Sequence, residues 1–174
     1  MQRRRFFTLA VSSASVGLVS SLALTGCGFA LRQAPDFVFR TIYTGLPESS
    51  VLGNELKRQL ESSRDVRVIT DARQLDQAEV ILEVVTDQRE KTVVGTNAAG
   101  QVREFQLRVR FAFTLRTPQG KELIPLTELL LQRDIGFNES AVLAKEAEEG
   151  LLYRDMQGDI VQQILRRLAA VKAL

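Results

Sequence analysis

The chain has 174 residues, of which 45% are hydrophobic, 25% charged and 6% aromatic, values typical of a one-domain globular protein and unlike collagen, coiled coils or disordered chains. It contains no His and one Cys, which excludes His-ligated zinc or haem, His-dependent nucleophilic sites and an internal disulfide. The net charge is +2, and Arg3, Arg4 and Arg5 supply three of the positive charges. The rest of the chain has 20 basic and 21 acidic residues, so its overall charge does not indicate a nucleic-acid-binding domain.

Residues 1–26 have the organisation of a signal peptide that is removed. The three arginines precede an apolar stretch, residues 9–24, that contains five serines. As a helix this stretch would span about 24 Å, less than the roughly 30 Å hydrocarbon core of a bilayer. A permanent transmembrane anchor is the alternative. The arginine-rich start resembles a twin-arginine export signal, which the serine-rich apolar stretch suits, and the general secretory route is the alternative.

The single cysteine, Cys27, directly follows this stretch. The segment Leu24-Thr25-Gly26-Cys27 resembles the bacterial lipobox, in which signal peptidase cleaves before the cysteine and the thiol carries a diacylglycerol. An incidental free or buried cysteine is the alternative. Each buried CH₂ group contributes about 0.8 kcal/mol, so several acyl chains would anchor the protein stably.

The sequence therefore predicts three segments: a cleaved signal peptide (1–26), a lipidated tether (27–36) and one α+β domain (37–174). Gly28 follows the cysteine where an Asp would resemble an inner-membrane retention signal. We expect a lipid-anchored protein of the Gram-negative outer membrane that faces the periplasm.

The first half of the domain alternates between strand and helix patterns. Residues 38–44 predict a strand and residues 51–62 a helix with three leucines on one face, whereas residues 66–69 form a short apolar run. Residues 80–85 begin a longer strand that we extend to Val94. Asn97-Ala98-Ala99-Gly100 then predicts a turn.

The clearest element is the strand that follows this turn. Its odd positions are apolar and its even positions mostly polar, which predicts one buried and one wet face; the apolar positions are Phe105, Leu107, Val109, Phe111, Phe113 and Leu115. Pro118-Gln119-Gly120 predicts another turn. Residues 122–133 predict a third long strand, in which Pro125 indicates an edge position or a bulge.

Residues 138–172 are predicted to be helical, with Asn138 or Ser140 as the N-cap and Gly150 as a break after a short lead-in helix. A core stripe steps along this helix at Leu152, Met156, Ile160, Ile164 and Leu168. The predicted fold is α+β: a two-layer sandwich with a mixed four-stranded sheet and two helices on one face.

The sequence contains no nucleophile elbow, phosphate-binding glycine loop or metal-ligand cluster, so we predict no enzyme activity, no metal and no cofactor. An acidic run at Glu146, Glu148 and Glu149 is interpreted as a solvated helix face. On the wet strand face, Arg108 and Arg110 lie about 7 Å apart and could bind an anionic headgroup. The alternative is a solvated surface with cross-strand partners, namely Glu83, Glu104 or Glu128.

The chain resembles the lipopolysaccharide-assembly lipoprotein family LptE. The resemblance begins at Cys27-Gly28-Phe29-Ala30-Leu31-Arg32 and continues through a hairpin followed by Glu104-Phe105-Gln106. It is strongest in Leu143-Ala144-Lys145-Glu146, followed by Glu149, Tyr153, Met156 and Ile164-Leu165-Arg166-Arg167-Leu168. Ala30 departs from the family, which usually has His there, and Ala98-Ala99 lacks a basic residue that some members carry.

This resemblance implies a non-catalytic subunit of the lipopolysaccharide translocon that binds lipopolysaccharide and supports or plugs a large β-barrel partner, LptD. Lys145 matches the family's lysine that is linked to lipopolysaccharide contact, and Lys91 or Arg103 could replace the missing hairpin base. The candidate lipopolysaccharide-binding residues are therefore Lys145, Lys91, Arg103, Arg108 and Arg110. A stand-alone periplasm-facing lipoprotein that binds a small or lipidic ligand is the alternative function.

Overall fold

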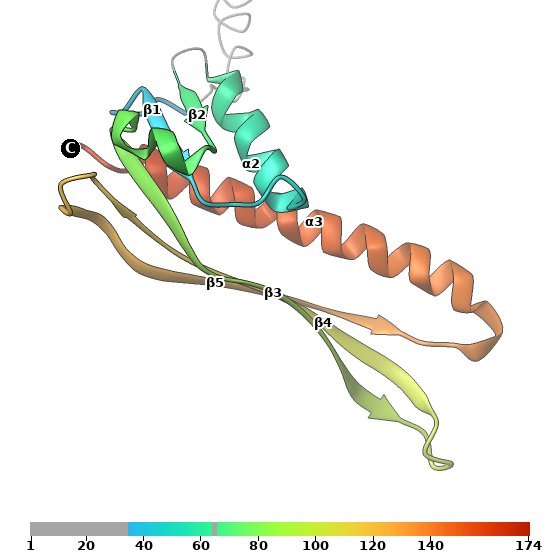
Figure 1. Cartoon of the computed structure of the whole chain (residues 1–174). Coiled ribbons are helices and arrows are strands. Elements are labelled where there is room, and N and C mark those ends of the chain that lie inside the picture. Colours follow the sequence, from blue (N-terminus) through green and yellow to red (C-terminus); the bar gives the residue numbers. More distant parts are fainter. Residues whose placement is uncertain (1–34, 64–65) are drawn as a thin grey trace, which may run out of the picture. The chain divides into compact units, whose positions relative to one another are not determined.

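The computed structural model describes residues 35–63 and 66–174 of the chain. The predicted signal peptide, Cys27 and most of the predicted tether lie outside the described residues, so lipidation of Cys27 stays a prediction. The described elements are β1 (Thr41–Thr44), α2 (Val51–Ser62), β2 (Arg67–Ile69), β3 (Val80–Thr96), β4 (Val102–Arg116), β5 (Glu122–Gly136) and α3 (Val142–Ala169) (Figure 1). Two 3₁₀ turns, Ala72–Gln77 and Glu139–Ala141, precede β3 and α3.

The strands form one mixed sheet in the order β2-β1-β3-β4-β5. β1 pairs in parallel with both β2 and β3, whereas β3, β4 and β5 form an antiparallel meander. The sheet has five strands and not the predicted four. The additional strand is the short apolar run at 66–69: the Arg67 N–H donates to Arg40 O at 2.8 Å and Ile69 is buried, so three residues suffice to add β2.

Both helices lie on the same side of this sheet, as predicted (Figure 1). Helix α2 has the predicted bounds because Ser50 caps it: the Ser50 Oγ accepts a hydrogen bond from the Gly53 N–H at 3.0 Å. Its three leucines, Leu52, Leu56 and Leu60, are fully buried. This confirms the leucine stripe as the face that packs on the core.

Strand β4 carries the centre of the core. Phe111, Phe113 and Leu115 are fully buried, and the same odd-numbered face continues through Val109 and Leu107. On β5, the pairing moves from Phe113–Thr127 to Leu115–Ile124, so Pro125 and Leu126 form a bulge on an edge strand. Pro125 therefore occupies both predicted kinds of position, and its missing N–H interrupts no continuous ladder.

Helix α3 runs without interruption through Gly150, so the predicted break is wrong. The 3₁₀ turn before it is capped by Asn138, whose Oδ1 accepts the Ser140 N–H at 3.0 Å. Four of the five stripe positions are fully buried, and Leu152 is half-buried against the core. Packing along one face holds the helix continuous, since the loss of helix propensity at a single Gly is only about 1 kcal/mol.

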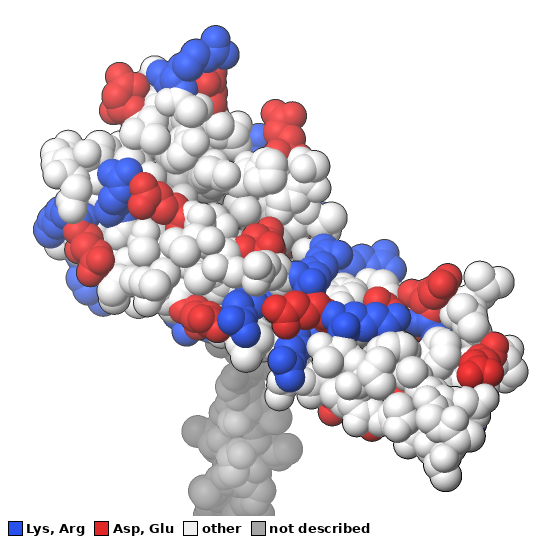
Figure 2. Space-filling view, turned by 60° about the horizontal axis from the view of Figure 1, so that its bottom comes forward, with Lys and Arg blue, Asp and Glu red and all other residues white. Residues whose placement is uncertain are grey.

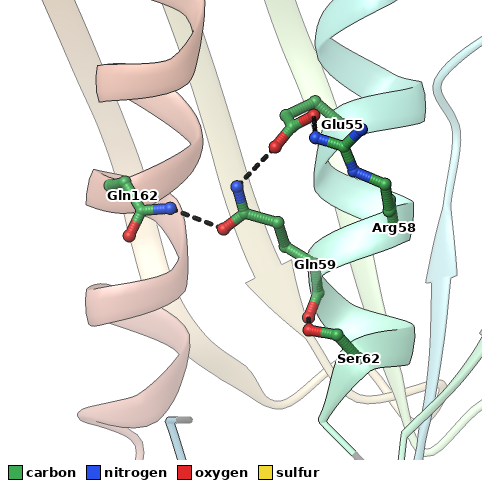
Figure 3. A network of polar contacts seen from close by, with 5 residues as sticks. All are labelled: Glu55, Arg58, Gln59, Ser62 and Gln162. Carbon is green, nitrogen blue, oxygen red and sulfur yellow. Dashed lines mark hydrogen bonds and ion pairs between the residues drawn. The ribbon is translucent and has the colours of Figure 1, made fainter. Parts of the chain in front are cut away.

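A polar contact joins the two helices at the edge of their apolar packing (Figure 3). The Gln162 Nε2 of α3 donates to the Gln59 Oε1 of α2, and the Gln59 Nε2 donates to Glu55. Glu55 also pairs with Arg58. These hydrogen bonds lower the pKa of Glu55, with the Gln59 amide as the largest cause.

Candidate functional site

A pocket lies between the first turns of α3 and the half of the β3–β5 meander that is nearer the β3–β4 turn. Its volume is about 230 Å³. Four apolar side chains line it: Phe105, Ile135, Phe137 and Val142. Four charged side chains line it as well: Lys91, Lys145, Glu146 and Glu149. The pocket therefore combines an apolar wall with both candidate lysines.

Lys91 reaches this pocket because its register on β3 places it opposite Leu107, on the face that α3 covers. Its Nζ lies 2.6 Å from Glu149 Oε2 and 4.3 Å from the centre of the Phe105 ring. Phe105 in turn packs edge-on against Phe137, with ring centres 5.3 Å apart. The ammonium group is thus held by one carboxylate and one aromatic face.

Lys145 approaches the same pocket from α3. Its Nζ forms an ion pair with Glu148 Oε2 at 2.8 Å, one turn further along the helix. The Lys145 side chain is 29% exposed. Lys145 therefore lines the pocket while it is paired with a carboxylate of its own helix.

Tyr153 fixes α3 to the strand that carries Lys91. Its hydroxyl donates to Glu90 O at 2.8 Å, and the Arg89 guanidinium lies 5.4 Å from the ring centre. Burial, followed by the negative charge of Glu149, raises the pKa of Tyr153 above its ordinary value. Lys145, Glu149 and Tyr153 follow each other at intervals of four, so one face of α3 supplies both the pocket and its attachment to β3.

The arginine candidates do not belong to this pocket. Arg108 and Arg110 lie on the opposite face of β4, which no described helix covers; the Arg108 Nε donates to Gln106 Oε1 at 2.7 Å. Arg110 lies 3.7 Å from Glu128, too far for a hydrogen bond although close enough for an ion pair. Arg103 lies near the hairpin turn, where its guanidinium donates to Gln101 at 3.3 Å.

The uncovered sheet face carries a mixed set of charges. Figure 2 shows basic and acidic side chains alternating in a band across it, whereas the region toward one end is mostly uncharged. Of the expected glutamate partners, Glu128 faces Arg110 and Glu83 pairs with Arg116 at 2.6 Å. The Arg116 hydrogen bond is the largest cause of the lowered pKa of Glu83. This face is therefore closer to a solvated charged surface than to a basic site.

The sequence interpretation missed the part played by Glu149, Phe137 and Val142. Glu149 was assigned to a solvated helix face, but its side chain is only 23% exposed and is paired across 58 residues with Lys91. The signals available for Glu149 were its interval of four from Lys145 and its place among the residues that carry the family resemblance. Within residues 35–63 and 66–174, no cluster of His, Cys, Asp or Glu side chains is arranged to hold a metal ion, and no helix is long and apolar enough to cross a membrane.

Comparison with known proteins identifies relatives across most of the chain. The family model for lipopolysaccharide assembly, LptE, matches residues 39–168. The LPS-assembly lipoprotein LptE of Pectobacterium atrosepticum is 27% identical over 172 residues, which cover 97% of this chain and 88% of that protein. The corresponding protein of Yersinia pestis is 27% identical over 174 residues, 98% of this chain and 79% of that protein.

Solved structures show the same fold. The solution structure of an uncharacterized lipoprotein B from Nitrosomonas europaea superimposes with a TM-score of 0.68 at 37% identity, covering 82% of this chain and 91% of that one. The rare lipoprotein B from Shewanella oneidensis superimposes with a TM-score of 0.60 at 22% identity, covering 75% and 94%. The second likeness concerns the fold alone.

Proposed function

The chain belongs to the LptE family of lipopolysaccharide-assembly lipoproteins, and from this we propose that it is a non-catalytic subunit of the lipopolysaccharide translocon of the outer membrane. In this role it binds lipopolysaccharide and supports or plugs a large β-barrel partner, LptD. The Cys27 thiol carries the acyl chains that anchor it, and the folded residues face the periplasm. Several acyl chains are needed, because one chain binds a membrane only reversibly.

One observation supports lipopolysaccharide as the ligand. Lys91 and Lys145, which are far apart in the sequence, both line a pocket whose remaining wall is largely apolar. Lipopolysaccharide carries phosphate groups directly beside acyl chains, so one ligand could meet both kinds of wall. An ammonium group binds phosphate as a point charge, and an apolar wall gains by removing hydrocarbon from water.

The partner is tested by purifying the full chain, tagged at its C-terminus, from detergent-solubilised outer membranes. We expect a large β-barrel protein to copurify. The Cys27→Ser variant serves as the control for the anchor, and we expect it to be lost from the outer-membrane fraction. Isolation of the wild-type chain as a solitary monomer would instead favour a stand-alone lipoprotein with a small or lipidic ligand.

The ligand is tested separately with Lys145→Asp. Reversing this charge should weaken lipopolysaccharide binding at constant ionic strength, since the Asp carboxylate would repel phosphate. The fold should persist, because Lys145 lies outside the hydrophobic core and its ion pair with Glu148 is a contact between neighbouring turns of one helix. Binding of labelled lipopolysaccharide and a thermal unfolding curve are measured on the same samples; unchanged affinity would remove Lys145 from the site.

A further inference from the structure

The pocket carries balanced charge, which is unusual for a site that binds an anion. Its two lysines are matched by two glutamates, Glu146 and Glu149, that line the same walls. Both ammonium groups are already paired: Lys91 with Glu149 at 2.6 Å, and Lys145 with Glu148 at 2.8 Å. A phosphate group entering the pocket would therefore meet lysines that have carboxylate partners on their own chain.

The carboxylate partner has an advantage over a free anion. Glu149 is fixed on α3 directly beside Lys91, so its effective concentration at the ammonium group is that of an intramolecular ligand. Tyr153, one turn further along, holds this part of α3 against Glu90 of β3 and keeps the two charges together. Inorganic phosphate has charge and hydrogen-bond acceptors but no apolar part, so it gains nothing from the apolar wall when it replaces Glu149.

An amphiphile has a second source of binding free energy in the same place. The Phe105 ring that lies under Lys91 also packs against Phe137, and both rings are only half-buried. A hydrocarbon segment next to a phosphate would cover these rings while the phosphate takes the Lys91 ammonium. The apolar contact would offset the loss of the Lys91–Glu149 pair.

We infer that the pocket binds the phosphorylated end of an amphiphile by ion exchange, in which the phosphate replaces Glu149 at Lys91, and that Glu149 sets the affinity as a competing internal counter-ion. This inference rests on the proposed binding of lipopolysaccharide, and it adds how the ligand binds and which anions the pocket selects against. A phosphate without an attached apolar segment is discriminated against, because both lysines of the resting pocket already have carboxylate partners.

The experiment compares Glu149→Gln with the wild-type full chain in nonionic detergent, using labelled lipopolysaccharide at constant ionic strength. Removing the counter-ion should tighten binding about two- to fivefold, the range expected for a partly exposed ion pair. Asp155→Asn removes the same charge from an exposed position of α3 outside the pocket and should leave the affinity unchanged. Thermal unfolding of each variant verifies that the fold is retained.

The Lys91→Gln background gives the decisive comparison. There Glu149→Gln should have no further effect on affinity, because the ammonium for which the carboxylate competes is gone. If Glu149→Gln tightens lipopolysaccharide binding equally with and without Lys91, the effect is general charge repulsion and the ion exchange is overturned. The same holds if Asp155→Asn tightens binding as much as Glu149→Gln does. Displacement of lipopolysaccharide from the wild type by inorganic phosphate more than by chloride at matched ionic strength would overturn it as well.

The outcomes for the two proposals differ. Absence of lipopolysaccharide binding by the wild type and by Glu149→Gln alike contradicts the proposed function itself. Binding by the wild type that Glu149→Gln leaves unchanged or weakens overturns only the ion exchange and leaves the proposed function in place.

Discussion

Tyr153 is the residue at which attachment of the helix and the electrostatics of the pocket meet. Its hydroxyl donates to Glu90 O, and Glu149 lies one turn before it on α3. Burial and the Glu149 carboxylate both disfavour the phenolate, which is why the pKa of Tyr153 is raised. The neutral phenol is also the form that can donate the hydrogen bond, so burial and the hydrogen bond to Glu90 both favour the protonated side chain.

This raised pKa predicts how stability changes in alkali. Because the pKa is higher in the folded than in the unfolded chain, the contribution of Tyr153 is complete below the unfolded pKa of about 10 and is lost as pH rises through the folded pKa. At neutral pH, Tyr153→Phe should lower the free energy of unfolding by about 0.5–1.5 kcal/mol. Urea unfolding at a series of pH values should show the wild-type advantage shrinking above pH ~10.

The same variant supplies a direct control. The difference between the phenolate absorbance of the wild type and that of Tyr153→Phe isolates the titration of Tyr153, and its midpoint should lie above 10. A midpoint at or below the ordinary value would contradict the burial of this side chain and its contact with Glu90.

At the scale of elements, α3 is a long helix that contains two glycines without a steric need for them. A Cβ added at Gly150 or at Gly158 would meet no atom within 4 Å, and both residues are helical. Glycine loses more conformational entropy on folding than alanine does. The continuity of α3 therefore comes from its packed face and not from its own helix propensity.

Gly150→Ala and Gly158→Ala should each raise the free energy of unfolding by about 0.5–1 kcal/mol, because alanine has the higher helix propensity and finds free space here. Gly100→Ala in the β3–β4 turn is the matched contrast: the Cβ also finds free space there, but φ is +78°. That variant should lower stability by about 1–2 kcal/mol. Urea unfolding of the three variants measures both the expected gains and the expected loss. A loss of stability for Gly158→Ala would contradict the free space found around this residue.

Bulges explain which strand positions could be assigned from the sequence. In β4 the period of two is unbroken over residues 105–115, and its buried face was predicted correctly. β3 has bulges or irregularities after Val84 and after Val93. Every second residue along β3 therefore does not stay on the same face of the sheet through the whole strand. The face on which Lys91 lies was for this reason not assigned before the structure was known.

At the scale of the whole molecule, local patterns predicted the elements and left their long-range contacts open. The bounds of α2, both turns and the α+β sandwich were predicted, since each depends on periodicity or on turn residues close in sequence. The pocket depends on a contact between Lys91 and Glu149, which register, strand twist and helix placement together bring about. The fifth strand likewise exists only because β1 offers it a parallel edge.

The core that β4 builds also predicts how the whole molecule unfolds. Phe111 is fully buried on β4, where it pairs with Leu129 of β5 and its ring centre lies 6.0 Å from that of Phe113, while α3 covers the same face. Phe111→Ala would leave a cavity that several elements share and should cost about 3–5 kcal/mol. Helix and sheet signals should then shift together to lower urea concentration in one transition.

Gln132→Ala is the control for this prediction, since Gln132 is exposed on the uncovered face of β5 and pairs with Arg108 of β4. Its effect should stay within about 0.5 kcal/mol. A shift below about 1 kcal/mol for Phe111→Ala would mean that the odd-numbered face of β4 is not the core. Separate transitions for helix and sheet would mean that α3 and the meander do not depend on one common core, because loss of a shared core must unfold both layers at once.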